Sequence, residues 1–384
     1  MNVLLLTQFF SETRGGGEYV FKVLADLLVR NNHKVWVIAN KIAGEEYEDK
    51  ENLKIIFVKP TLLHDLASLP RLSDNFRYCI NATRAALGII KDEKIDLIHS
   101  NNFAPALAGS ILSYITSRPH ILTIHDVFSL CGRNYWKSWG KQSSASRVGV
   151  LLGPFFEKLI LRLKHECIHT VSESTRDDLV LFGAKKPIHV IHNTISRHED
   201  IDSIVNPLQF VHVGRLVFYK NLEVAIKAIK IVKETEPNVK LVIAGNGPHK
   251  KYLENMVESM GLQSNVQFRG YVSDSEKKSL LASSNAMIFP SLCEGFGLVI
   301  LEAFSFGRPV LVSNIKPMSD IVSRKNGYLL DPYDEKSWAE SMLKIIKKPS
   351  DASMMGRDGK KVLVESYNQE SMYRKIMDMY TKVS

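Results

Sequence analysis

Short apolar runs alternate along the chain with longer stretches in which apolar residues recur at helical spacing. In the first half the short runs are residues 3–6, 35–39, 55–58, 97–99, 121–124, 167–171 and 189–191. Most are apolar at successive positions, which is typical of parallel strands covered on both faces. The stretches between them, such as residues 18–30 and 75–92, have the pattern of amphipathic helices. This alternation predicts βαβ units in a doubly wound parallel sheet.

The alternation restarts after a polar segment at residues 195–207. The second series of expected strands and helices comprises residues 210–213, 222–234, 239–244, 250–260, 266–268, 286–289, 309–312 and 327–330. We therefore expect an α/β protein with two doubly wound, Rossmann-like domains, over residues 1–200 and 201–365, which face a central cleft. In such sheets ligands bind beyond the carboxyl ends of the strands, so the loops that follow strands are the places to look for a site.

Composition narrows the class of protein. A chain of 384 residues, 45% hydrophobic and 24% charged, is long enough for two domains with separate cores. The net charge of +9 is spread over both halves, which argues against a nucleic-acid-binding domain. The four cysteines lack metal-finger spacing, the N-terminus lacks the features of a signal peptide, and no run is long enough to span a bilayer. These features predict a cytoplasmic protein without a nucleic-acid partner.

The segment EGFGLVILE, from Glu294 to Glu302, carries the most specific chemistry. A strand is expected to end at Phe289, and a helix is expected to begin near Gly297. Glycines at a helix start let backbone amides approach a ligand, and the positive end of the helix favours a phosphate. The two carboxylates can accept hydrogen bonds from sugar and ribose hydroxyls. Two glutamates alone are equally compatible with a loop charge and a surface helix residue.

The whole run, with Pro-Ser upstream and Gly-Phe-Gly directly after the first glutamate, resembles the donor site of the retaining glycosyltransferases of family 4. Members of that family have the GT-B architecture, in which two Rossmann-like domains hold the donor in the cleft between them. The resemblance implies that the donor is bound by Glu294, Gly295, Phe296, Gly297, Leu298 and Glu302, with Glu294 also acting in catalysis.

The segment VGRLVFYKN, at residues 213–221, resembles the Gly-Arg-x4-Lys loop of the same family. On that match Arg215 and Lys220 contact the donor pyrophosphate and act in catalysis. Two cations just after a strand can neutralise charge that develops on a nucleoside-diphosphate leaving group. Without the resemblance, an arginine and a lysine in a loop would more often be solvated surface residues.

Two further segments follow the family pattern more weakly. LVIAGNGP, at residues 241–248, lacks the third glycine of a dinucleotide fingerprint, so we reject a nicotinamide cofactor. The Gly-Tyr-Val turn after the expected strand at residues 266–268 implies that Tyr271 and Val272 line the base pocket. Plain core packing of these two side chains is equally compatible with the pattern.

The N-terminal half contributes two candidates. Gly15, Gly16 and Gly17 precede a long amphipathic helix, and they match the family's Gly-Gly loop, whose backbone faces the donor phosphates or the acceptor. His125 follows a buried strand and matches the family's His-Asp motif, which implies that it reaches the donor sugar and the reacting centre. A lone histidine is more often a packed core residue, but the carboxyl end of a strand favours a functional role.

The sequence and its resemblance therefore predict a metal-independent, retaining glycosyltransferase that needs no cofactor. Its expected partners are a UDP- or GDP-sugar donor and a glycan or lipid-linked acceptor, in polysaccharide or cell-envelope glycan synthesis. The sequence has no Asp-x-Asp motif in a suitable setting, and the two cations can take the place of a divalent metal. Two alternatives remain: a non-transferring GT-B enzyme, such as a sugar-nucleotide epimerase or a phosphorylase, and a silent sugar-nucleotide-binding subunit.

Two expectations concern the ends of the domains. Residues 147–165 mix leucine, phenylalanine and isoleucine with lysine and arginine, which is compatible with peripheral contact to an anionic membrane at the inner face of the cytoplasmic membrane. A helix packed on the N-terminal sheet explains the same pattern. In that case we expect the preceding loop, and not the helix, to contact the membrane. The resemblance also implies that the last helix, within residues 366–384, packs back on the first domain.

Overall fold

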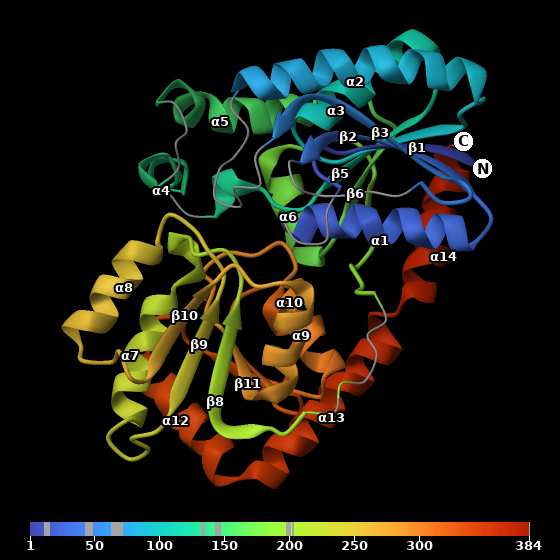
Figure 1. The fold of residues 1–384 in the computed structure, drawn as a ribbon. Coiled ribbons are helices and arrows are strands. Elements are labelled where there is room, and N and C mark those ends of the chain that lie inside the picture. The colour runs from blue at the N-terminus through green and yellow to red at the C-terminus, as the bar shows by residue number, and fades with distance from the viewer. Residues whose placement is uncertain are drawn as a thin grey trace. The chain divides into compact units, whose positions relative to one another are not determined.

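The chain forms two compact units, Met1–Thr194 together with Gln369–Ser384, and Ile195–Asn368. Figure 1 shows the two units of the computed structural model. The structure describes residues 1–10, 16–42, 49–62, 72–131, 135–142, 147–196, 201 and 203–383.

The N-terminal unit contains a seven-stranded parallel sheet with the order β3-β2-β1-β4-β5-β6-β7. The strands are β1 (Asn2–Leu6), β2 (Lys34–Ile42), β3 (Leu53–Leu62), β4 (Leu97–Ser100), β5 (His120–Ile124), β6 (Cys167–Thr170) and β7 (Ile188–Val190). The connecting helices are α1 (Gly16–Arg30), α2 (Leu72–Asp92), α3 (Ala104–Thr116), α4 (Tyr135–Gln142), α5 (Arg147–Ile160) and α6 (Glu173–Phe182), with a 3₁₀ turn at Phe128–Leu130. The last helix of the chain, α14 (Gln369–Val383), belongs to this unit.

The C-terminal unit repeats the plan with a six-stranded parallel sheet of order β10-β9-β8-β11-β12-β13. Its strands are β8 (Asn206–Val213), β9 (Lys240–Ala244), β10 (Val266–Gly270), β11 (Ser284–Phe289), β12 (Val310–Ser313) and β13 (Gly327–Leu330). Its helices are α7 (Leu222–Val232), α8 (Lys250–Ser259), α9 (Asp274–Ser283), α10 (Leu298–Ser305), α11 (Met318–Ile321), α12 (Glu335–Lys347) and α13 (Pro349–Ser366), with a 3₁₀ turn at Phe218–Lys220.

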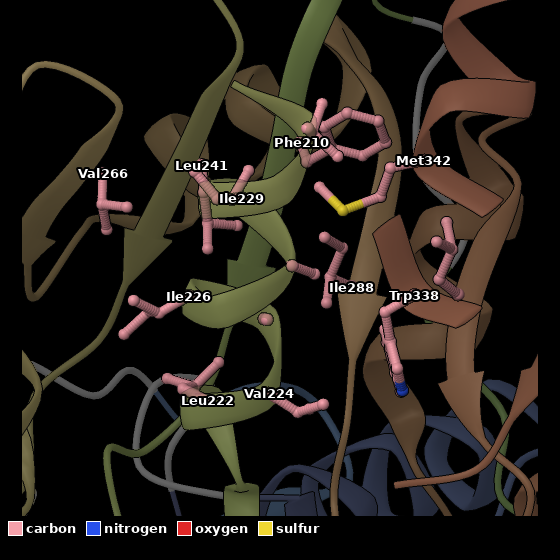
Figure 2. Packing of buried hydrophobic residues seen from close by; sticks show 14 of the residues in the cluster. Phe210, Leu222, Val224, Ile226, Ile229, Leu241, Val266, Ile288, Trp338 and Met342 are labelled. Carbon is pink, nitrogen blue, oxygen red and sulfur yellow. The ribbon is translucent and has the colours of Figure 1, made fainter. Parts of the chain in front are cut away.

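Helices cover both faces of each sheet, so the central strands are buried on both sides. All residues of β4, β5, β6, β11 and β12 are buried, as expected of parallel strands that are covered on both faces. In the C-terminal unit, apolar side chains of α7, α12 and strands β8, β9 and β11 gather in one core (Figure 2). Trp338 of α12 is fully buried there, and its indole N–H donates to the carbonyl of Asp331 at 2.8 Å.

The α/β fold class is confirmed, with both sheets parallel and doubly wound. Each expected strand overlaps an observed one, although β2, β3 and β8 are longer than the pattern predicts. Some helices begin elsewhere than the pattern predicts. Helix α1 begins at Gly16, so Gly16 and Gly17 lie in its first turn rather than before it. The last helix begins at Gln369, because α13 continues to Ser366.

Candidate functional site

Lys220 and Glu294 form an ion pair through Nζ and Oε1, although they lie far apart in the sequence. Lys220 ends the 3₁₀ turn after β8, and Glu294 lies in the loop after β11. The two side chains are 12% and 13% exposed. The Lys220 ammonium also lies 4.7 Å from the centroid of the Phe289 ring, which holds it by a cation–π contact. The fold therefore brings together two of the predicted catalytic residues at one edge of the sheet.

Arg215 lies on the same loop as Lys220 and is half-buried. Its Nη2 donates to the hydroxyl of Tyr219 at 3.3 Å. Backbone hydrogen bonds tie this loop to the turn after β9, from the Gly214 amide to Ala244 at 3.0 Å and from the Leu216 amide to Asn246 at 2.9 Å. The glycine-rich turn thus supports the loop that carries both predicted phosphate cations.

Helix α10 begins directly after the Gly-Phe-Gly segment. Gly297 is the N-cap, with φ of 91° in the left-handed region, where a side chain would be strained. Gly295 and Phe296 are buried, and the Phe296 ring packs against the edge of Tyr367 at 5.7 Å between centroids. Leu298 is the first helical residue and is half-buried. This arrangement places the positive end of a helix beside Glu294, in a form that suits an anionic ligand.

Glu302 lies on α10 and is 8% exposed, so the surface-residue reading is wrong. Its Oε1 accepts a hydrogen bond from Nζ of Lys277 at 2.7 Å, and the same ammonium lies 3.1 Å from Asp274. Burial alone would lower the pKa of Lys277, but the carboxylates of Glu302 and Asp274 outweigh it and raise that pKa above its ordinary value. Lys277 is therefore a cation that orients Glu302.

Sequence reasoning missed Lys277. The local signal is a capping box at the start of α9, in which Ser273 accepts from the Glu276 amide and Glu276 from that of Ser273. That box locates the helix, and Asp274 one turn before Lys277 indicates an ordinary surface pair. Only the packing of α9 beside α10 brings Lys277 to Glu302.

Tyr271 and Val272 follow β10 at the same edge of the sheet. The Gly245 amide donates to the carbonyl of Gly270 at 2.7 Å, which ties this turn to the glycine-rich turn after β9. Tyr271 is 41% exposed and Val272 is half-buried. Plain core packing therefore does not account for Tyr271.

In the N-terminal unit, His125 follows β5 and is 9% exposed. A Cβ atom on Gly17 would lie 2.9 Å from Cδ2 of His125, so only glycine allows the first turn of α1 to approach the imidazole this closely. Gly16 is exposed at the start of the same helix, and Gly15 lies outside the described residues. The fold thus brings two sequence-predicted groups, Gly17 and His125, into contact within one unit.

The His125 ring is neutral at ordinary pH. Burial and, to a smaller extent, the neighbouring His169 lower its pKa from 6.5 to about 3. Nε2 of His125 lies 3.1 Å from Oδ1 of Asn101, a residue that sequence reasoning did not select. Nearby, Ser172 accepts from the Thr175 amide and caps α6.

Among the described side chains, no three His, Cys, Asp or Glu residues are grouped so as to hold a metal ion. No helix in the described ranges is both long enough and apolar enough to cross a membrane.

Comparison with known proteins gives matches over nearly the whole chain. Residues 14–199 match the family profile Glycosyltransferase Family 4, and residues 196–379 match Glycosyl transferases group 1. The uncharacterized glycosyltransferase MJ1607 of Methanocaldococcus jannaschii is 27% identical over 99% of this chain and 98% of its own. The O-antigen chain mannosyltransferase RfbU of Salmonella typhimurium is 30% identical over 52% of this chain and 56% of its own.

Several solved structures share the fold along the whole chain. Anabaena Alr3699/HepE in complex with UDP-glucose aligns with a TM-score of 0.71 and 18% identity, covering 100% of both chains. The two family profiles meet where the chain passes from one unit to the other, and each covers most of one doubly wound sheet. The chain therefore belongs to the GT-B glycosyltransferases of family 4, group 1.

Proposed function

We propose that the chain is a retaining glycosyltransferase that moves a hexosyl group from a UDP- or GDP-sugar to a glycan or lipid-linked acceptor. The observation that carries this proposal is the Lys220–Glu294 ion pair beside the N-terminus of α10, with Arg215 on the same loop as Lys220. Cations and a helix N-terminus suit a diphosphate, and a carboxylate suits sugar hydroxyls. HepE, whose structure contains UDP-glucose, supports this class of donor, and RfbU supports a role in glycan synthesis.

In the proposed reaction the acceptor oxygen bonds to the anomeric carbon on the face from which the diphosphate leaves. The departing phosphate oxygen takes the acceptor's proton, so configuration is retained without a covalent enzyme intermediate. Arg215, Lys220 and the start of α10 stabilise the negative charge that develops on the leaving group. Glu294 and Glu302 hold donor hydroxyls, and Tyr271 and Val272 lie beside the base. With this charge on the chain itself, the reaction needs neither a divalent metal nor a cofactor.

The test begins with a thermal-shift panel of UDP, GDP and other nucleotides, followed by transfer assays with the matching sugar nucleotides. We expect the anomeric proton of the product to have the configuration of the donor, and EDTA to leave the rate unchanged. An inverted product, or activity abolished by EDTA and restored by a divalent metal, contradicts the proposed mechanism. Free nucleotide and epimerised sugar without any acceptor would identify an epimerase instead.

We also propose that α5 contacts an anionic membrane surface. Leu151, Phe155 and Leu159 recur every four residues on one face of this helix and are 80%, 61% and 39% exposed, while Lys158 and Arg162 are exposed beside them. Apolar residues flanked by cations favour anionic lipid. The sequence argument left such contact to the preceding loop, and residues 143–146 of that loop lie outside the described residues.

Co-sedimentation with vesicles of phosphatidylcholine, with and without phosphatidylglycerol, tests this contact. We expect binding only with the anionic lipid, and severalfold weaker binding for Phe155→Ser. The matched control is Val364→Ser on α13, which is equally exposed at 63%. Equal sedimentation of both variants and the wild type would assign the exposed face of α5 another role.

A further inference from the structure

The hydrogen bonds around His125 decide which of its ring nitrogens carries a proton. Nε2 faces Oδ1 of Asn101 at 3.1 Å, and the first turn of α1 packs on the Cδ2 edge through Gly17. Nδ1 lies on the opposite side of the ring and makes no hydrogen bond with any described residue. What Nδ1 can bind therefore depends on the tautomer.

The orientation of the Asn101 amide follows from its neighbours. The backbone N–H of Asn102 lies 2.9 Å from Oδ1 of Asn101, and a backbone N–H can only donate. Nδ2 of Asn101 donates to Oγ1 of Thr7 at 3.4 Å, and the Thr7 hydroxyl donates in turn to the carbonyl of Phe9 at 2.9 Å. Both ends of the amide are thus assigned, with oxygen toward His125.

An amide oxygen accepts and never donates, so Nε2 of His125 must carry the proton that joins it to Asn101. Burial keeps the pKa of His125 at about 3, and the ring therefore carries only this proton at neutral pH. Two titratable groups face it from neighbouring strands, His99 and His169, and burial lowers the pKa of both, so they are uncharged as well. The next residue in the chain, Asp126, is acidic. Nδ1 is left with a lone pair.

We propose that Asn101 is a positioning residue that locks His125 as the Nε2–H tautomer, so that Nδ1 recognises a hydrogen-bond donor on the substrate. The group recognised is a hydroxyl or N–H, because a carboxylate or phosphate oxygen would set a negative charge against the lone pair. The inference rests on the proposed glycosyl transfer for the identity of the substrate, but the proton on Nε2 follows from the hydrogen bonds of Asn101.

The first experiment reads the tautomer without any activity. Long-range proton–nitrogen spectra of protein labelled with 15N-histidine distinguish a protonated from an unprotonated ring nitrogen, and a His125→Gln spectrum assigns the signal. We expect Nε2 protonated and Nδ1 unprotonated between pH 8 and 5. A protonated Nδ1 in the wild type overturns the proposal, whatever reaction the protein performs.

The second experiment uses Asn101→Asp. A carboxylate keeps an acceptor at Nε2, but its charge should raise the pKa of His125 by ~1–3 units. Below that pKa both nitrogens carry protons and the Nδ1 lone pair is lost. We therefore expect kcat/KM of this variant to rise with pH through the His125 pKa that the spectra measure, whereas the wild type shows no such step. The absence of the step in Asn101→Asp overturns the recognition role.

Two further variants separate positioning from folding. Asn101→Leu removes the acceptor and frees the tautomer, so kcat/KM should fall about tenfold, the effect of one lost hydrogen bond. Asn81→Asp adds the same charge on α2, where Asn81 donates to Lys59 at 3.0 Å, and should keep the wild-type pH profile. A matching step in Asn81→Asp would trace the effect to net charge and overturn the role of Asn101.

Discussion

The two units share a doubly wound plan but keep their polar groups in different places. In the N-terminal unit a hydrogen-bonded chain runs through the sheet, from Tyr380 of α14 to His99 at 2.7 Å, to Thr123 at 2.6 Å, and on to His169 at 2.9 Å. In the C-terminal unit the main core cluster is apolar, and ion pairs gather beyond the strands at Lys220–Glu294 and Lys277–Glu302.

The buried polar groups of the two units therefore have different roles. The network of the N-terminal unit joins the last helix of the chain to the middle of the sheet, since Tyr380 is fully buried against His99. The ion pairs of the C-terminal unit lie at the loop edge, where a ligand can reach them. We therefore expect changes in the first set to affect mainly stability and changes in the second to affect mainly binding and turnover.

Lowering the pH should have the largest effect, and it should mainly lower the stability of the N-terminal unit. Burial lowers the pKa of His120 and His169 from 6.5 to about 4. At pH values between about 4 and 6.5, these histidines bind protons in the unfolded chain but not in the folded chain. The free energy of unfolding therefore falls as the pH drops from about 6.5 to about 4. Each histidine contributes about 3 kcal/mol at most.

Hydrogen exchange measured by mass spectrometry at pH 7 and pH 5, corrected for intrinsic rates, resolves the two units. Protection of β4–β6 should fall more than that of β9 and β12, because in the C-terminal sheet His212 alone has a pKa lowered to about 4 among the described residues. Removing one titrating group by His169→Gln should make the pH dependence shallower. Equal losses in both sheets would contradict the comparison.

Loss of the Lys220–Glu294 ion pair should have the next largest effect, which is on turnover. Lys220→Ala and Glu294→Ala should each reduce turnover by ~100-fold or more, because each removes a charge placed where the transition state develops charge. Steady-state kinetics with the accepted sugar nucleotide measures this. Lys250→Ala, which breaks the partly exposed pair with Glu254 at 3.8 Å, is the matched control and should leave turnover unchanged. Full activity of either site variant would refute its assignment.

Breaking the Lys277–Glu302 ion pair should weaken nucleotide binding. In Lys277→Met the Glu302 carboxylate loses the cation that orients it, and we expect about tenfold weaker binding of the accepted nucleoside diphosphate, or ~1.4 kcal/mol. Calorimetric titration measures this, and the preference for ribose over 2′-deoxyribose should shrink in parallel. Lys278→Met is the control, since Lys278 pairs with Asp274 at 2.5 Å and has no contact with Glu302 among the described interactions. An unchanged preference for ribose over 2′-deoxyribose would show that Lys277 has no role in recognising the nucleotide.

The smallest effect concerns the last helix. Tyr380→Phe removes the hydroxyl that bonds to His99 and should lower the free energy of unfolding by about 1–2 kcal/mol, with nucleotide affinity unchanged. Tyr373→Phe removes a similar bond to His33 at 2.9 Å, but at a partly buried position, and should cost less. Denaturant titration compares the two variants, and a larger loss for Tyr373→Phe would contradict the central role of the buried network.

Much of the fold was predictable because it depends on local pattern. The residues of β9 and β12 are almost all buried, so the apolar runs of these strands were easy to recognise. Gly297 marks the start of α10 through a backbone conformation that favours glycine. The exact start of α14 was not predictable, because α13 continues to Ser366 and only Tyr367 and Asn368 separate the two helices. The fold class and the family follow from these patterns and motifs.

The sequence by itself determined the parallel sheets and the loops that carry Arg215, Lys220, Glu294 and His125, because strand periodicity and motif spacing are properties of neighbouring residues. Only the tertiary structure decided which side chains meet. It paired Lys220 with Glu294 and Lys277 with Glu302, and it set Asn101 against His125. These contacts join residues of different strands and helices, and hydrogen-bond direction and burial arise only when those elements pack.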